Sequence, residues 1–342
     1  MNSQEKTSSL YHSVTIGNMT FDGNLFLAPL AGYTDRAFRS VCIENGASFT
    51  YTEMVSAEGL ARESANTEKL LIRARNEEFL GVQIFMNDSS VSMRSLEKLL
   101  KYNPSIIDIN CGCPVPKVVK TGAGSALMNE PEKIRKMVEE LKEHTDIPIS
   151  IKIRKGWNET SVNFREVAAA AVGAGVDMIT MHARTRSMYY SGSADWDSLK
   201  ELKDYTRKTA PSVIIFGSGD LFTPQSAKDM LEQTGIDGVM FARGAIGNPF
   251  IFERTKALLT GKPQEEPPLE IRLQVMLRQL HLMGTYSGEQ LACREMRKHA
   301  ASYLKGLPHG ARAKQALVQA TTFHEYERVC DSLLNGTLIP LN

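Results

Sequence analysis

The sequence has few cysteines, no long apolar run and no recognisable metal or dinucleotide motif, and each absence narrows its function. Its five cysteines are odd in number and scattered, which is typical of a reducing compartment rather than of a disulfide framework. No apolar run approaches the roughly 20 residues that span a bilayer. The polar start, residues 1–13, lacks the apolar core of a secretory signal. We therefore expect a soluble, cytoplasmic protein with no membrane association.

Charge and missing motifs exclude further classes. The formal net charge of +1 over 342 residues gives no global bias, so a polyanionic partner would have to meet a local basic face. The close pair Cys111 and Cys113 has neither a second pair nor an HxxxH motif nearby, so no metal site is indicated. The segment LAPLAGYTD lacks the GxGxxG of a nicotinamide dinucleotide site. Oligomeric state leaves no readable signal, and a monomer is our default.

What is present is an alternation of short apolar segments with longer amphipathic ones. Eight segments have the β-branched, apolar character of strands buried on both faces, and they begin at Leu25, Phe49, Leu80, Ile106, Ile149, Met178, Val213 and Gly238. The stretches between them, such as residues 131–145 and 163–176, place apolar residues at helical spacing. Eight strand–helix rounds predict an α/β fold closed into a TIM (β/α)8 barrel. A doubly wound open sheet, the alternative, would not require eight units.

The C-terminal part differs in character from the rest. A proline-rich, charged segment that begins at Thr260 indicates a linker, and residues from about 270 to 334 have helical patterns only. This part carries many basic side chains: Arg272, Arg278, Arg294, Arg297, Lys298, Lys305, Arg312 and Lys314. We expect residues 1–260 to form the barrel and residues 261–342 to form a separate, all-helical domain.

The chemistry of such a barrel belongs at the carboxyl ends of its strands, where Cys113 follows the fourth strand. In the stretch IIDINCGCPVPKVVKTGAGSALM, residues 106–128, Gly112 breaks the strand and Pro114 fixes the backbone beyond the thiol. Cys113 could be a metal ligand, an inert core thiol such as we expect for Cys111, a nucleophile with a lowered pKa, or a general acid. For the last role, an ordinary pKa of about 8.5 already keeps the thiol protonated at neutral pH.

Lys152 lies inside the fifth predicted strand, where an unpaired buried charge is costly. One interpretation is a structural ion pair with a carboxylate such as Glu53. The other is a cation beside an electron-rich ring, where it would stabilise a reduced, anionic flavin. His182 could donate to the same ring, and Gln83 offers both a donor and an acceptor for its pyrimidine edge.

The seventh and eighth strands end in glycine-containing turns, residues 217–221 and 241–249. Loops in these positions form the recurrent phosphate site of this barrel, because backbone N–H groups can approach an anion there. Arg243 would add a charged clamp. The alternative is a pair of tight turns without a ligand; two such turns in these positions favour a cofactor that carries a phosphate.

These motifs together resemble the tRNA-dihydrouridine synthases, FMN enzymes with a TIM barrel and a C-terminal helical domain. The matching segments are APLAGYTDRAFR, GVQIFM, DINCGCPVPKV with GAGSALM, IKIRKGW, MHARTR with YYSGSADW, GSGDL, ARGAIGNPFIF and REMRKHAASYLKGLP. The resemblance covers nearly the whole chain, and in overall pattern the sequence is most similar to the bacterial B-type branch.

The resemblance implies a role for the residues at the matching positions. Those implied to bind FMN are Pro29, Leu30, Ala31, Gln83, Lys152, His182, Ser218, Gly219, Asp220, Ala242 and Arg243. Cys113 would be the catalytic acid, and Asn110 and Arg184 would contact the substrate. The family usually has asparagine where Ser218 stands and glycine where Ala242 stands, so we expect altered flavin contacts but not a lost site.

The implied reaction is reduction of the C5=C6 bond of specific uridines in tRNA. NADPH or NADH would reduce the FMN and leave; a hydride would then move from the flavin to C6 while Cys113 protonates C5. The helical domain would hold the tRNA, because extruding a base costs a few kcal/mol. Two alternatives are an FMN barrel acting on a small molecule, similar to dihydroorotate dehydrogenases or ene-reductases, and an RNA-binding chaperone without redox function. The basic helical part argues against the first, and Cys113, Lys152 and Gln83 together argue against the second.

Overall fold

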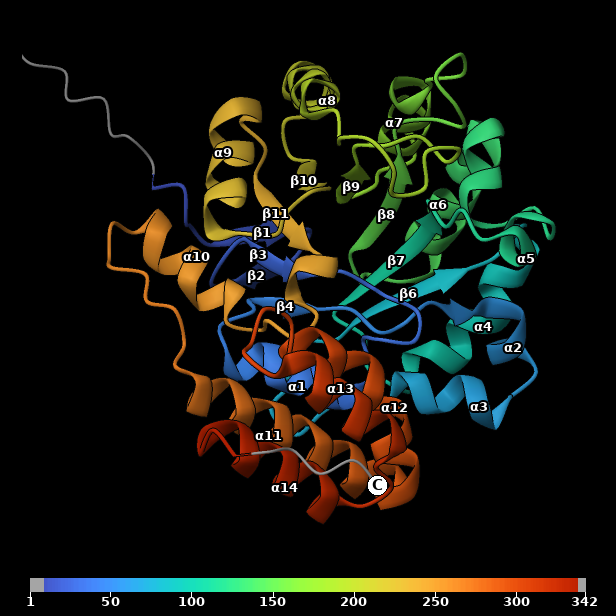
Figure 1. Ribbon diagram of the computed structural model, residues 1–342. Coiled ribbons are helices and arrows are strands. Elements are labelled where there is room, and N and C mark those ends of the chain that lie inside the picture. The colour runs from blue at the N-terminus through green and yellow to red at the C-terminus, as the bar shows by residue number, and fades with distance from the viewer. Residues whose placement is uncertain (1–8, 338–342) are drawn as a thin grey trace, which may run out of the picture.

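The computed structural model describes residues 9–337, and it confirms the predicted α/β barrel with a helical C-terminal part (Figure 1). A short antiparallel hairpin comes first, β1 (Val14–Ile16) with β2 (Met19–Phe21). The parallel strands of the barrel follow in chain order: β3 (Leu25–Leu27), β4 (Phe49–Thr50), β5 (Val55–Ser56), β6 (Gly81–Phe85), β7 (Ile106–Cys111), β8 (Ile149–Arg154), β9 (Met178–His182), β10 (Ile214–Ser218) and β11 (Gly238–Phe241). Neighbouring strands pair in the order β4-β3-β11-β10-β9-β8-β7-β6-β5.

The second predicted strand is divided into β4 and β5, and this division closes the barrel. β4 pairs with β3, whereas β5 pairs with β6 on the other side. Between them Tyr51 bridges Gly81 in parallel, and the N–H of Thr52 donates to the carbonyl of Gly81. The ladder is then interrupted because the N–H of Gln83 meets the hydroxyl of Thr52, at 3.3 Å, instead of a carbonyl.

Helices surround the barrel: α1 (Arg36–Glu44), α2 (Ala57–Ala61), α3 (Ala65–Glu68), α4 (Ser90–Leu100), α5 (Pro116–Val119), α6 (Pro131–His144), α7 (Phe164–Gly173), α8 (Trp196–Thr209), α9 (Pro224–Thr234) and α10 (Ile251–Leu259). Their apolar faces bury the outer surface of the strands in one continuous cluster. A second cluster fills the barrel at the amino ends of its strands, where Phe21 of the hairpin packs on Phe26 and Phe49 with ring centroids 5.5 and 4.7 Å away. The carboxyl ends are therefore the open end.

Strand register gathers polar side chains near that open end. Gln83 lies opposite Asp108, Asn110 opposite Lys152, and Arg154 opposite His182. Parallel strands in a closed barrel bring such residues from separate parts of the chain to one rim. This register, more than any single motif, positions the site.

The chain after α10 forms four helices that lie together beside α1 (Figure 1). They are α11 (Leu269–Ser287), α12 (Glu289–Tyr303), α13 (Gly310–Gln319) and α14 (Phe323–Leu334). Their buried faces make a cluster of their own, which Ala37 of α1 joins. Arg278 also pairs with Glu44 across this contact, at 2.9 Å. Among residues 9–337, no helix has the length and apolarity needed to cross a membrane.

His299 of α12 is fully buried where these helices meet the barrel. Its ring centroid lies 4.9 Å from that of Phe38 and 5.4 Å from that of Tyr33, and its Nε2 is 3.9 Å from the carboxylate of Asp35. Within residues 9–337 neither ring nitrogen has a hydrogen-bond partner. Burial, reinforced by the charge of Lys298, lowers the pKa of His299 to about 3.

We predict that His299 lowers the free energy of unfolding in mild acid. In the unfolded chain the His299 imidazole takes up a proton below its ordinary pKa of about 6.5, whereas in the folded protein it stays neutral. The free energy of unfolding therefore decreases as the pH falls from 7. Between pH 7 and 5 the loss from this group is about 2 kcal/mol. Urea unfolding at both pH values should show His299→Phe to be less pH-dependent than the parent by about that amount. An identical pH dependence in both proteins would contradict the account.

Candidate active site

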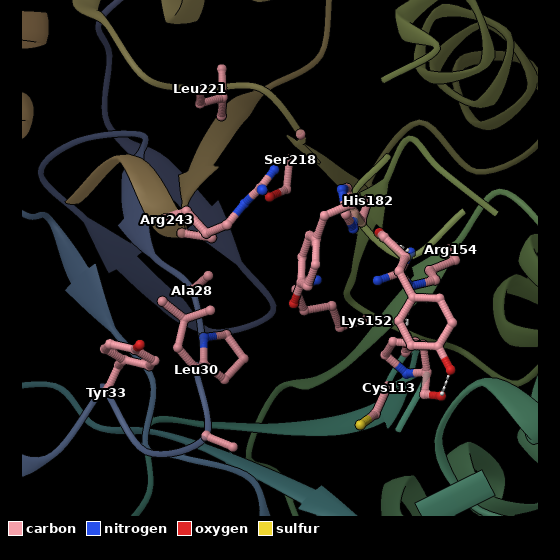
Figure 2. Close-up of a pocket in the computed structure, with 18 of the residues that line it drawn as sticks. Ala28, Leu30, Tyr33, Cys113, Lys152, Arg154, His182, Ser218, Leu221 and Arg243 are labelled. Carbon is pink, nitrogen blue, oxygen red and sulfur yellow. Dashed lines mark hydrogen bonds between the residues drawn. The ribbon is translucent and has the colours of Figure 1, made fainter. Parts of the chain in front are cut away.

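A cavity of about 590 Å³ opens at the carboxyl ends of the strands (Figure 2). Nearly all the side chains singled out in the sequence line it: Pro29, Leu30, Ala31, Gln83, Asn110, Cys113, Lys152, His182, Ser218, Gly219, Asp220, Ala242 and Arg243. They come from seven different strand ends, which the barrel alone brings together. Their individual roles remain predictions, but they share one cavity.

A chain of hydrogen bonds fixes the turn that carries Cys113. The side-chain oxygen of Asn110 accepts from the backbone N–H groups of Gly112, at 3.2 Å, and Cys113, at 2.9 Å. Its amide group donates to Gln83, at 2.7 Å, and Gln83 in turn donates to Asp108, at 2.7 Å. These amides are therefore oriented by protein before any ligand arrives.

Asp108 ends that chain and was not identified from the sequence. It is fully buried and also accepts from the hydroxyl of Ser150, at 2.6 Å. Burial raises the pKa of Asp108 to about 6, although the donors Gln83 and Ser150 oppose the rise. Its position in the apolar segment IIDIN could have identified it from the sequence, because a buried carboxylate there needs hydrogen-bond donors.

Cys113 is half-buried in the cavity wall, whereas Cys42, Cys111, Cys293 and Cys330 are buried. Burial raises the pKa of the Cys113 thiol above its ordinary value; the N–H of Val115 and the charges of Arg154 and Lys152 favour the thiolate less strongly. A thiol with a raised pKa stays protonated at neutral pH. This state suits a proton donor and disfavours a nucleophile.

We predict that Cys113 behaves as the one accessible and unactivated thiol of the folded protein. Its alkylation rate by iodoacetamide should rise with pH to a midpoint above the ordinary thiol value of about 8.5, because burial raises the pKa of Cys113. Mass analysis should place the label on Cys113, and Cys113→Ser should abolish fast labelling. A midpoint below pH 8 would instead reveal an activated thiolate and would contradict the proton-donor assignment.

Lys152 enters the same cavity without an acidic partner. Glu53, which the sequence offered as its partner, instead accepts a hydrogen bond from the backbone N–H of Gly32. Within the part of the chain that the structure describes, no carboxylate forms an ion pair with the Lys152 amine. Burial, then repulsion from Arg154, lowers the pKa of Lys152 to about 8, so the amine still carries its charge at pH 7. The ion-pair interpretation is thus not supported, and the cation is available to a ligand.

Other side chains make the cavity electropositive. Arg243 and Arg154 line it together with Lys152. Burial lowers the pKa of Arg154 to about 10, which leaves it charged at neutral pH. Burial, helped by Arg154 and Lys152, lowers the pKa of His182 well below its ordinary value, so the imidazole is neutral. A neutral imidazole can donate from one nitrogen and accept at the other.

Arg154, at the end of β8, was not assigned to the site from the sequence. Its Nε donates to the carbonyl of Gly112, at 2.8 Å, and its Nη1 donates to the carbonyls of Thr185, at 2.9 Å, and Tyr189, at 3.0 Å. The guanidinium therefore ties the turn before Cys113 to the loop that follows β9. It holds two walls of the cavity in fixed positions.

The structure does not bring Arg184 into the cavity. Its guanidinium is buried and pairs with both carboxylate oxygens of Asp220, each at 2.8 Å, and it donates to the carbonyls of Ser191 and Gly192. The structure gives Arg184 these structural contacts, and its predicted contact with the substrate stays a prediction. The Asp220 carboxylate also accepts from the N–H of Ala194, at 2.8 Å, and lies 3.8 Å from the guanidinium of Arg243.

The turns after β10 and β11 have the close packing that an anion cradle needs. Gly219 has φ +124°, and a Cβ there would lie 2.8 Å from that of Ala194. Asp220, which follows it, also has a positive φ of 60°. A Cβ on Gly244 would clash with the carbonyl oxygen of Leu221. A side chain is thus excluded at Gly219 and at Gly244, so the backbone is exposed to the cavity at these two positions.

Several cavity residues were not identified individually from the sequence. Tyr33, Tyr189, Tyr190 and Phe222 line the opening, and Ser302 of α12 reaches it from the C-terminal helices. Arg243 lies 4.4 Å from the ring centroid of Tyr190 and 5.2 Å from that of Phe222. The segment YYSGSADW contains two of these tyrosines, but residues in a loop have no periodicity that would show which side chains face the cavity.

Comparison with known proteins gives consistent results. A model of the dihydrouridine synthase family (Dus) matches residues 26–336. A probable tRNA-dihydrouridine synthase of Treponema pallidum is 44% identical over 327 residues, which is 94% of this chain and 96% of the relative. The tRNA-dihydrouridine synthase B of Pasteurella multocida is 33% identical over 305 residues, or 88% and 90% of the two chains. In a complex of 2-naphthoyl-CoA reductase with 2-naphthoyl-CoA, 75% of this chain matches 52% of the reductase with TM-score 0.57 and 11% identity, so the likeness concerns the fold.

Proposed function

This chain belongs to the dihydrouridine synthase family, and from that premise we propose that it reduces specific uridines of tRNA to 5,6-dihydrouridine. One observation carries the proposal: a protonated thiol, Cys113, shares a cavity with a half-buried cation, Lys152, that has no acidic partner. A reductase that adds a hydride and a proton across a C=C bond needs a positioned acid and an environment that stabilises negative charge.

We propose FMN as the cofactor, because the residues present fit a planar anionic ligand with a phosphate. Lys152 is half-buried without an acid, Arg243 adds a second charge, and Gly219 and Gly244 stand where a side chain would clash. Pro29, Leu30 and Ala31 would line the ring. Ser218 and Ala242 stand where the family usually has asparagine and glycine; serine keeps a polar group and alanine adds one methyl.

FMN, when bound, would supply the hydride for C6 of the uracil, with NADPH or NADH as the proposed source of electrons. The protein would supply the proton and the geometry. Cys113 would donate its proton to C5, and its turn is held by Asn110 and Arg154. Asn110 keeps its amide group beside the cavity, where it is proposed to position the uracil.

The helices after residue 260 are the proposed tRNA-binding domain. A second cavity of about 820 Å³ adjoins the first and shares Phe222, Arg243, Ile246 and Ser302 with it. Arg272 and Lys305 of the helical part line this second cavity. A basic groove that leads from the helices to the catalytic opening suits an RNA whose reacting base must leave its stack.

A coupled assay tests the function and the role of Cys113. Protein supplied with FMN and NADPH would be incubated with unmodified tRNA transcript and with native tRNA from a strain lacking dihydrouridine synthases, and dihydrouridine would be measured by mass after nuclease digestion. We predict dihydrouridine at defined positions. Cys113→Ala should keep its yellow flavin and its NADPH oxidation yet form at least about 100-fold less dihydrouridine, because general acid catalysis contributes 10²–10⁴-fold.

Two outcomes would contradict these statements. If Cys113→Ala forms dihydrouridine as fast as the parent, Cys113 is not the acid. If the parent protein is yellow and oxidises NADPH but leaves both RNAs unchanged, a small-molecule substrate becomes the better assignment.

A further inference from the structure

An arginine outside the cavity is stacked between two aromatic side chains on the loops that border it. The guanidinium carbon of Arg186 lies 4.5 Å from the ring centroid of Trp157 and 5.9 Å from that of Tyr189. The backbone holds the arrangement, because the N–H of Arg186 donates to the carbonyl of Gly156, at 2.8 Å, and that of Ser187 to the carbonyl of Trp157, at 3.0 Å. We call Trp157, Arg186 and Tyr189 the outer stack.

The charge of the outer stack is not neutralised by the protein. Within residues 9–337 no carboxylate pairs with Arg186, and its buried Nε has no hydrogen-bond acceptor. The acids on neighbouring elements are engaged elsewhere: Glu159 and Asp195 both pair with Lys155, at 3.3 and 3.0 Å. Among the described residues, the guanidinium is therefore in contact with aromatic rings and with no acid, which leaves its charge available to an external anion.

The outer stack is directly connected to the catalytic cavity through Tyr189. That side chain lines the cavity, is 38% exposed, and donates from its hydroxyl to the carbonyl of Pro114, at 3.3 Å, next to Cys113. Tyr189 also adopts φ +53°, a left-handed conformation that is unusual for a tyrosine. Such strain occurs where the surroundings impose it, and here it presents the ring at the opening.

We propose that the outer stack binds the nucleotide adjoining the reacting uridine, with Arg186 contacting its phosphate and Tyr189 stacking on its base. The inference rests on the proposed function, since it assumes an RNA substrate. Single-stranded RNA is bound by this combination of exposed aromatic faces and arginine planes, because every base has a π face and every linkage a negative charge. A protein partner would be expected to supply a carboxylate and an apolar anchor, whereas the stack offers an aromatic face beside a cation at the entrance to a base-sized cavity.

Salt dependence of tRNA binding tests the proposal without catalysis. Flavin-loaded enzyme, with no NADPH present, would be titrated with tRNA between about 50 and 200 mM salt. A lost phosphate contact reduces the slope of log K against log[salt] by about 0.7 to 0.9. Arg186→Gln should show this reduction and bind about 10-fold more weakly, whereas Arg186→Lys should keep the slope because it keeps the charge.

The controls separate a local contact from a general effect. Arg207→Gln removes an exposed arginine near the carboxyl end of α8, which lies toward the opposite end of the barrel, and it should leave both slope and affinity unchanged. The flavin spectrum and NADPH oxidation of Arg186→Gln should match those of the parent. An unchanged slope in Arg186→Gln, or an equal loss in Arg207→Gln, would overturn the proposal. Failure of the parent to form dihydrouridine would instead count against the proposed function itself.

Discussion

A lysine amine buried at the end of a parallel strand, with no acid to neutralise it, is the constraint around which this site is organised. Removing a charge from water costs free energy that neighbouring groups must offset. Burial, reinforced by the charge of Arg154, lowers the pKa of Lys152 to about 8, and the charge of Asp108 offsets this only in part. The folded protein therefore contains a positive charge, on Lys152, that no acid pairs with, and an anionic ligand would neutralise it.

The acidic side chains around the cavity are bound to other groups, so a ligand and not the protein would neutralise this charge. The one acid at the far wall, Asp220, is held by Arg184, and Glu53 is held by the backbone of Gly32. Asp108 is occupied by Gln83 and Ser150. Arg243 lies 3.8 Å from the Asp220 carboxylate, which it shares with Arg184, and the backbone at Gly219 completes that wall. Burial, reinforced by the positive side chains around it, keeps His182 neutral.

Sequence patterns predicted the barrel because strands buried on both faces have continuous apolar runs, and eight of them alternate with amphipathic helices. The cavity followed, because residues at the carboxyl ends of such strands must meet at one rim. The break between β4 and β5 was not predicted, since it depends on a hydroxyl, that of Thr52, taking a place in the ladder. The pairing of Arg184 with Asp220 was not predicted, because the two residues are distant in sequence and near only after folding. The outer stack went unnoticed because aromatic residues in loops carry no periodicity.

The central claim is that the cavity is an anion cradle matched to a flavin that bears a phosphate. Titration calorimetry with FMN and with riboflavin, which lacks the phosphate, tests it most directly. The account predicts that FMN binds at least about 100-fold more tightly, since hydrogen bonds to a charged group contribute roughly 1.5–3 kcal/mol each. It also predicts that Arg243→Gln removes much of the difference. Equal affinities for the two flavins would contradict the account.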